Sequence, residues 1–185
     1  MCKDWKRYLI GIAALALGLV SAPAMAHCDF LTGGGFIVRD SGAKGNFGVG
    51  GGCKHGAFWG HLEYIDHGTG LNVHWLTITA YFATETRGEE KDPKRMGTRV
   101  ICGTARTNAP VGDVDFIVIA TDNGEPGVDD EFTIQLKKNG ALVYTTVNDS
   151  NHTLGGSGPG GGNIQLHKPN PSTSANAGPG SCPAA

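Results

Sequence analysis

The sequence predicts an all-β domain, either a β-sandwich or a barrel-like fold, built from about eight to nine short strands with Gly-rich turns. Three observations support this fold class. Apolar and polar residues alternate with a period of two in many short runs, whereas helical periodicity is confined to the first 26 residues. Glycine occurs 30 times and charged residues make up only 17% of the chain, which favours strands and tight turns over helices. Dipeptides such as Asn123-Gly124 and Asn139-Gly140 supply turns between the runs.

Residues 1–26 have the pattern of a secretory signal peptide. A positively charged start is followed by an apolar run, and Ala24-Met25-Ala26 supplies a small-x-small cleavage signal. The apolar run is shorter than the ~20 residues that a membrane-spanning helix needs, so we expect cleavage near Ala26 and no membrane span in the mature chain. The mature protein is therefore expected to be secreted or periplasmic, and bacterial in the style of its leader.

Several runs of the mature chain are predicted to be strands. The clearest is 130–138, where Phe132, Ile134 and Leu136 share one face and polar side chains share the other. Within the run 114–121, residues 116–120 are apolar on both faces, so we expect this strand in the centre of a sheet with both faces covered. The predicted strands are residues 35–39, 45–50, 58–65, 71–82, 98–107, 114–121, 130–138, 141–147 and 163–167.

Two segments break this alternation. Residues 84–97 carry many charges of both signs and hardly an apolar side chain, so we expect a solvated loop between two strands, with a partner-binding loop as the alternative. Residues 168–185 are rich in Pro, Ser, Asn and Gly and have little to pack, which predicts a flexible tail. Residues 27–167 then form a single all-β domain.

The mature chain is acidic on balance. Of the 15 basic and 17 acidic residues in the sequence, the leader contains three basic and one acidic, which leaves 12 and 16. Binding to phosphate backbones needs a clustered positive surface. We therefore do not expect nucleic acid as a partner.

The mature chain contains four cysteines, Cys28, Cys53, Cys102 and Cys182. An even number in an exported protein indicates disulfides rather than a metal site or a nucleophile. Three connectivities are possible. We favour Cys53 with Cys102, both inside the patterned region, and Cys28 with Cys182, which lie near the two ends. No CxxC motif occurs, which argues against thioredoxin-like exchange.

Six short motifs follow one another along the mature chain. They are residues 32–37 (TGGGFI), 44–48 (KGNFG), 60–67 (GHLEYIDH), 69–74 (TGLNVH), 121–127 (TDNGEPG) and 160–167 (GGGNIQLH). The series resembles the small secreted bacterial β-domain family known as the post-COAP domain, and the resemblance spans residues 32–167. It implies an extracellular β-rich module without an assigned activity. The charged segment, the cysteines and an insertion at 157–159 depart from the family pattern.

Histidines are the first candidates for a metal site. On a straight strand over 58–66, His61, Glu63 and His67 project from one face, and His167 lies on the polar face of the last predicted strand. Imidazole suits Zn and Cu, and a carboxylate can complete such a site. Successive residues on one face of a strand are about 7 Å apart, so a single ion would need ligands from neighbouring strands. The alternative is that these histidines face solvent or are hydrogen-bonded.

A copper site at the amino terminus is a further hypothesis. Cleavage after Ala26 makes His27 the first residue, and its amine and imidazole would chelate Cu(II). His67 or His167 would then complete a T-shaped site. Cleavage after Ala24 fits the leader equally well and would remove this site.

Acidic residues are concentrated in a turn between two predicted strands. Asp122, Glu125, Asp129 and Asp130 offer hard oxygen ligands of the kind that Ca²⁺ takes in exported domains. Their spacing does not match the helix–loop–helix calcium pattern, and the turn dipeptides of this segment are explained by turn geometry alone. A calcium site and a solvated turn therefore both remain open.

No catalytic constellation stands out, because the serines lie among glycine and polar residues without a nucleophile-elbow pattern. We therefore do not expect an enzyme. One functional class is a structural or interaction module at the cell surface or in the extracellular space, which engages a protein or polymer through strand edges and loops. The alternative is a secreted or periplasmic metal-binding protein, with Cu or Zn on histidines or Ca on the 122–131 loop.

Overall fold

The structure is a computed structural model that describes residues 28–89, 92–156, 158–173, 177 and 180–183. The predicted signal peptide at 1–26 and His27 lie outside the described residues. The predicted fold class is confirmed, because nine strands form one antiparallel sheet. The elements are β1 (Phe30–Val38), β2 (Lys44–Lys54), β3 (Ala57–Asp66), β4 (Leu71–Arg87), β5 (Met96–Thr107), β6 (Val114–Asp122), β7 (Glu131–Lys138), β8 (Ala141–Thr145), β9 (Gly162–His167) and the short 3-10 helix η1 (Pro171–Thr173).

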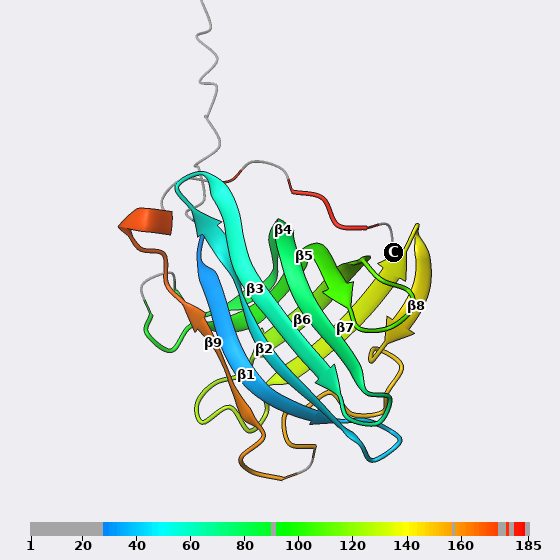
Figure 1. The fold of residues 1–185 in the computed structure, drawn as a ribbon. Helices are drawn as coiled ribbons and strands as arrows, with labels where there is room; N and C mark the ends of the chain where they lie inside the picture. The colour runs from blue at the N-terminus through cyan, green and yellow to red at the C-terminus, as the bar shows by residue number, and fades with distance from the viewer. Residues whose placement is uncertain (1–27, 90–91, 157, 174–176, 178–179, 184–185) are drawn as a thin grey trace, which may run out of the picture.

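The sheet is a meander that curls into a half-barrel (Figure 1). Each strand from β1 to β8 pairs with the next strand in sequence, and β9 returns to the free side of β1, which gives the order β8-β7-β6-β5-β4-β3-β2-β1-β9. Asn139 and Gly140, both at positive φ (52° and 81°), form the predicted two-residue turn between β7 and β8. The edges of the sheet are therefore β8 and β9.

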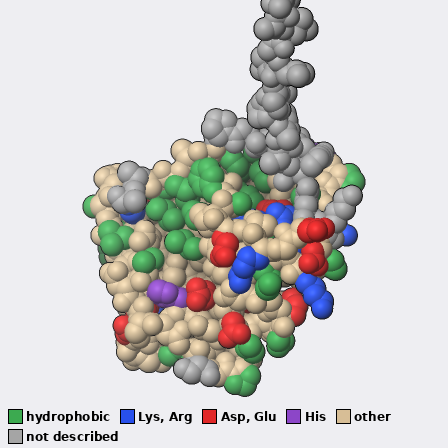
Figure 2. Space-filling view, turned by 180° about the vertical axis from the view of Figure 1, so that it is seen from behind, with side chains coloured by type: hydrophobic (Ala, Val, Ile, Leu, Met, Phe, Trp, Pro, Cys, Tyr) green, Lys and Arg blue, Asp and Glu red, His purple; other side chains and the backbone are tan. Residues whose placement is uncertain are grey.

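The inward faces of the strands form the core. The rings of Phe47 and Phe132 stack with their centroids 3.9 Å apart, and Phe116 and Ile101 are fully buried in the same core. This arrangement follows from the alternation in the sequence, because every second residue of a strand points to the same face. The expectation that β6 is covered on both faces is wrong, since Ile119 on its outer face is 38% exposed. Figure 2 shows apolar side chains gathered on the back of the molecule.

The backbone of residues 146–156 bridges the gap between the start of β7 and the end of β1, beyond the parts of these strands that pair with β8 and β9. The Leu154 N–H donates to the carbonyl oxygen of Asp130, beside β7, at 2.9 Å. The Gly155 N–H donates to the carbonyl oxygen of Phe36 in β1 at 2.8 Å. Leu154 is fully buried between them. This irregular segment therefore supplies hydrogen-bond partners to both sides of the gap.

Two buried carboxylates take the place of a neighbouring strand at the outer edge of β9. Asp130 Oδ2 accepts a hydrogen bond from the Ile164 N–H at 2.6 Å, and Asp122 Oδ2 accepts one from the Leu166 N–H at 2.7 Å. The other carboxylate oxygen of Asp122 accepts from the Gly124 N–H at 2.8 Å. Because Asp122 ends β6 and Asp130 precedes β7, these bonds fasten β9 across the half-barrel and protect its edge.

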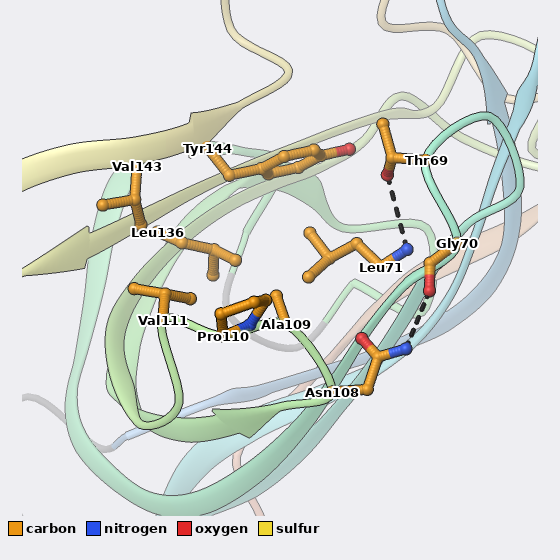
Figure 3. Close-up of a pocket in the computed structure, with 10 residues that line it drawn as sticks. All are labelled: Thr69, Gly70, Leu71, Asn108, Ala109, Pro110, Val111, Leu136, Val143 and Tyr144. Atoms are coloured by element: carbon orange, nitrogen blue, oxygen red, sulfur yellow. Dashed lines mark hydrogen bonds between the residues drawn. The ribbon is translucent and has the colours of Figure 1, made fainter.

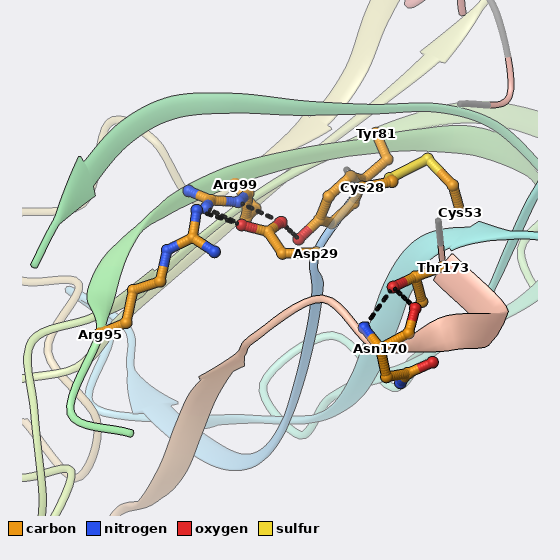
Figure 4. The surroundings of a disulfide bond; sticks show 8 residues. All are labelled: Cys28, Asp29, Cys53, Tyr81, Arg95, Arg99, Asn170 and Thr173. Carbon is orange, nitrogen blue, oxygen red and sulfur yellow. Dashed lines mark hydrogen bonds and ion pairs between the residues drawn. A yellow bond between two sulfur atoms is a disulfide. The ribbon is translucent and has the colours of Figure 1, made fainter. Parts of the chain in front are cut away.

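A buried ion cluster lies immediately before β1 (Figure 4). Asp29 accepts hydrogen bonds from Tyr81 Oη at 2.8 Å and Arg99 Nε at 3.0 Å. Arg95 Nη2 lies 2.8 Å from the same carboxylate. Arg99 has no exposed surface, and its Nη1 also donates to the carbonyl oxygen of Glu85 at 2.6 Å. The buried guanidinium is thus paired and hydrogen-bonded, as a buried charge must be.

The charged segment 84–97 is only partly the predicted solvated loop. β4 continues to Arg87 and β5 begins at Met96, so both ends of this segment are paired strand. The Arg95 side chain is 11% exposed because it turns inward to Asp29. The sequence could not show this inward turn, since the partner carboxylate lies far away in the chain.

The disulfides join Cys28 to Cys53 and Cys102 to Cys182. The pairing favoured from the sequence, Cys53 with Cys102 and Cys28 with Cys182, is therefore wrong. The register of β1 against β2 explains the first bond, because it brings the segment before β1 beside the end of β2. Two disulfides are compatible with an extracellular protein. In the described part of the chain, no helix has the length and apolar character needed to cross a bilayer.

The segment 168–185, predicted to be a flexible tail, is attached to the sheet at its described residues. The His55 N–H donates to the carbonyl oxygen of Ser172 at 3.0 Å, close to η1. Further along, Thr79 Oγ1 donates to the carbonyl oxygen of Ser181 at 3.0 Å, next to the disulfide on the outer face of β5. The prediction that this segment has little to pack against is wrong for these residues.

We predict that Arg99→Leu destabilises the fold by about 3 kcal/mol, because it removes one partner of a buried carboxylate and leaves Asp29 poorly compensated. Urea unfolding measures the change. Arg106→Leu is the matched control, since Arg106 is exposed on the same strand, and should shift the free energy of unfolding by about 0.5 kcal/mol or less. Equal unfolding midpoints for the two variants would contradict the structural role of Arg99.

We also predict that Asp122→Asn lowers the free energy of unfolding by about 1–3 kcal/mol. The amide offers one acceptor oxygen where the carboxylate serves two N–H donors, so either Gly124 or Leu166 loses its partner. Asp129→Asn, an exposed position in the same turn, is the control and should change little. Faster amide hydrogen exchange at Leu166 in the first variant alone would locate the effect at β9, and unchanged exchange there would refute it.

Candidate functional site

A pocket of about 420 Å³ opens at the end of the half-barrel where β3 and β4 meet (Figure 3). Its walls come from β8 and β7, the β3–β4 turn and the connection between β5 and β6. Its volume is within the range of ligand pockets, which often lie in the mouths of β-barrels. The pocket is lined by Thr69, Gly70, Leu71, Asn108, Ala109, Pro110, Val111, Leu136, Val143 and Tyr144.

The polar groups around this pocket are already engaged. Thr69 Oγ1 accepts a hydrogen bond from the Leu71 N–H at 3.3 Å. Asn108 Nδ2 donates to the carbonyl oxygen of Gly70 at 2.9 Å, and Asn108 Oδ1 accepts from the Asn72 N–H at 2.7 Å. Leu136 and Leu71 are buried, whereas Val143 at the rim is 43% exposed. The pocket therefore offers an apolar surface to a ligand.

A network of polar side chains fixes the Tyr144 wall of the pocket. The Tyr144 hydroxyl donates to Asp66 Oδ2 at 2.8 Å and lies 2.7 Å from the Tyr64 hydroxyl. It also accepts a hydrogen bond from Arg39 Nη1. A residue with a side chain would not fit at Gly45, because its Cβ atom would lie 2.4 Å from the Tyr64 hydroxyl oxygen. The hydroxyl of Tyr144 is thus fully occupied within the protein.

Arg39, the residue that follows β1, is the centre of this network. Its Nη1 donates to Asp66 Oδ2 at 2.8 Å, and its Nη2 donates to the carbonyl oxygen of Thr145 in β8 at 3.1 Å. Its Nε pairs with Asp149, and its guanidinium carbon lies 5.1 Å from the centre of the Tyr144 ring. Arg39 therefore joins the end of β1 to β3 and β8, and β8 is a strand with which β1 does not pair.

The protonation states of the network follow from burial and pairing. Burial raises the pKa of Tyr144, and the hydrogen bond with Tyr64 raises it further, so the phenol stays neutral. Burial alone would raise the pKa of Asp66, but hydrogen bonds from Tyr144 and from the N–H groups of Gly68 and Thr69 outweigh it and hold the pKa below its ordinary value. The site therefore holds a neutral phenol against a fixed ion pair, which suits binding better than proton transfer.

The structure does not bring the predicted Cu or Zn ligands together. His61 and Glu63 are exposed on the outer face of β3, where Glu63 pairs with His74, and His67 lies in the following turn. His167 Nε2 is 2.8 Å from the hydroxyl of Thr32, and burial lowers the pKa of its ring. His27, the remaining predicted ligand, lies outside the described residues. Among the described residues, no group of three or more His, Cys, Asp or Glu side chains is arranged to hold a metal ion.

The predicted calcium ligands Asp122 and Asp130 instead hold β9 through its N–H groups, as described above. Burial raises the pKa of Asp130. Glu125 Oε1 accepts a hydrogen bond from Asn163 Nδ2 at 3.2 Å, and Asp129 is exposed. The acidic turn thus has a structural explanation in its backbone contacts.

Neither the residues of the pocket nor the Arg39 network was predicted from the sequence. The local signals were weak, because Arg39 follows an apolar strand but is directly followed by Asp40, and Asp66 lies two residues before Gly68 in a turn. The pairing itself depends on how the sheet curls. Arg39 and Tyr144 are 105 residues apart in the sequence.

Comparison with family models, with curated proteins and with solved structures finds no match to this chain. The resemblance to the post-COAP domain therefore stays a prediction from the motifs.

We predict that the Arg39 network makes stability depend on pH below about 4. The folded pKa of Asp66 lies below its value in the unfolded chain, so its contribution is present above the unfolded pKa of ~3.9 and is lost as the pH falls through the folded pKa. Thermal unfolding between pH 7 and pH 3 should show a larger decrease for the wild type than for Asp66→Asn. Asp113→Asn, an exposed position, should behave as the wild type does. Parallel curves for all three proteins would refute this role of Asp66.

Proposed function

We propose that this chain is an exported interaction module that binds an apolar group of its partner in the pocket between β8 and the β3–β4 turn. The observation that carries the proposal is the chemistry of the pocket wall. Its polar side chains are paired with one another or with the backbone, while Leu71, Val111 and Val143 offer apolar surface. An apolar group gains from leaving water there without losing hydrogen bonds.

The proposal includes secretion to the cell surface, the extracellular space or the periplasm. The predicted leader supports it, and so do the two disulfides, which persist in oxidising compartments. The resemblance to the post-COAP domain supports an extracellular module in the same way. The partner is an extracellular protein or polymer that displays an apolar group.

Binding is favoured over catalysis because the polar groups of Tyr144 and Arg39 already form hydrogen bonds or ion pairs within the protein. The Tyr144 hydroxyl has three partners within the protein, and the Arg39 guanidinium is engaged by Asp66, Asp149 and the Thr145 carbonyl group. A general acid or nucleophile must reach the substrate within hydrogen-bond distance. These groups serve instead to hold the pocket wall in place.

We predict that Val143→Asp weakens binding of the neutral fluorophore 1-aminoanthracene by at least about tenfold, because a bound ring would desolvate the new carboxylate. Fluorescence titration measures the dissociation constant. Leu142→Asp is the matched control, since it places the same charge on the neighbouring residue of β8, which does not line the pocket. It should bind within about twofold of the wild type.

Two results would refute the proposed function. The first is a wild-type protein that does not bind the fluorophore at millimolar concentration. The second is an equal loss of binding in both variants, which would place the bound fluorophore elsewhere on the surface. Urea unfolding of each variant verifies that the fold is retained.

A further inference from the structure

We infer that the partner of this pocket is an extended peptide segment that adds to the free edge of β8 and places one apolar side chain into the pocket. This inference rests on the proposed function and names the class of partner. It starts from the position of β8, which pairs with β7 on one side and ends the sheet on the other. The pocket and the sheet edge are continuous, because Val143 and Tyr144 belong to β8 and line the pocket.

The hairpin register shows which main-chain groups of β8 face outward. Lys138 and Ala141 flank the two-residue turn and are the hydrogen-bonded pair that closes it, so the next pair, Lys137 and Leu142, is not hydrogen-bonded. The N–H and C=O of Leu142 therefore point away from β7. The same reasoning places the carbonyl group of Thr145 outward, and there it accepts its hydrogen bond from Arg39 Nη2.

A β-bulge in β8 explains how this strand both forms the edge of the sheet and lines the pocket. The register shifts between Leu136 and Lys137, so that Val143 is an extra residue opposite β7. Both Val143 and Tyr144 can then line the pocket, while Leu142 stays at the open edge. An extended peptide beside Leu142 would have its inward side chain between β8 and the β3–β4 turn, where the pocket lies.

The composition of β8 also suits an added strand. Its sequence, ALVYT, has no charge and no proline, the two devices that most often protect an edge. Leu142 and Val143 are 51% and 43% exposed. By contrast, the other edge of the sheet is closed, since Asp122 and Asp130 occupy the N–H groups of β9. Of the two outermost strands, β9 is thus sealed, and β8 is open among the described residues.

The size of this edge favours a peptide over a second copy of the chain. β8 has five residues, which at about 3.3 Å each gives an edge about 16 Å long. A stable dimer needs about 800 Å² on each partner, from roughly 20–30 residues a side. Two β8 strands paired with each other would offer much less, and the turns around the pocket would not take part. A peptide needs only the edge and the pocket.

The experiment is an NMR titration with a blocked heptapeptide of alternating threonine and valine. Leu142→Pro removes the outward N–H without removing a hydrogen bond to β7, a position where an edge strand tolerates proline. Leu142→Thr is the matched control, because it removes the same apolar side chain and keeps the N–H. We expect the wild type and Leu142→Thr to bind within about twofold of each other, and Leu142→Pro to bind at least about tenfold more weakly.

A second measurement needs no variant. In the wild type, the Leu142 N–H should exchange with solvent more slowly as the peptide saturates, and resonances of Val143 and Val111 should shift. This keeps the inference testable even when proline unfolds the hairpin. Peptide binding to Leu142→Pro as tightly as to the wild type, or unchanged exchange at Leu142, would overturn strand addition.

The two proposals fail in different ways. Binding of 1-aminoanthracene together with no binding of the peptide leaves the pocket intact and overturns the peptide partner. Absence of binding for both probes overturns the proposed function as well. Concentration-dependent dimerisation that Leu142→Pro abolishes, without peptide binding, would assign the edge to a second copy of the chain and overturn the inference.

Discussion

The fold depends on the way in which β1 is held at its two ends. Asp29 directly precedes this strand and is the centre of a buried ion cluster, and Arg39 directly follows it and is the centre of a partly buried one. Each network links β1 to a strand that is not its neighbour in the sheet. Asp29 binds Arg99 in β5, and Arg39 binds the Thr145 carbonyl group in β8. Strand pairing in the meander joins only neighbouring strands, so these contacts, with the backbone of residues 146–156, add links between strands that are not neighbours in the sheet.

The two ends of the half-barrel differ in how their interior is filled. At the Asp29 end, a disulfide also joins the residues just before β1 to β2, and Arg99 fills the interior without any exposed surface. At the Arg39 end, the guanidinium donates to the Thr145 carbonyl group of β8, and the space beside Leu136 and Leu71 is lined mainly by apolar side chains. The pocket is the volume that closure at this end does not fill. Its position is therefore a consequence of how the sheet is closed.

The sequence predicted the parts of this structure that depend on local periodicity. Residues 130–138 alternate over their whole length, and the structure has β7 there. The strand over 35–39 was predicted too short, because the glycines that precede it have no side chains to alternate, although β1 begins at Phe30. For Asp122 and Asp130 the sequence left a calcium site and a solvated turn both open, because it does not show that a strand 34 to 44 residues away donates its N–H groups to them. The Arg39 network and the pocket were missed for the same reason.

A pocket wall that is fixed before a ligand arrives has an energetic advantage. The Tyr144 ring lies beneath a guanidinium and its hydroxyl is held by three partners, so binding need not order it and loses little conformational entropy. The same contacts would be poor recognition elements, because a ligand would have to break an internal hydrogen bond to use them. Specificity must then come from the apolar shape of the pocket and from main-chain groups that the fold leaves open. Among the described residues, such groups lie on β8 at Leu142, directly beside the fixed wall.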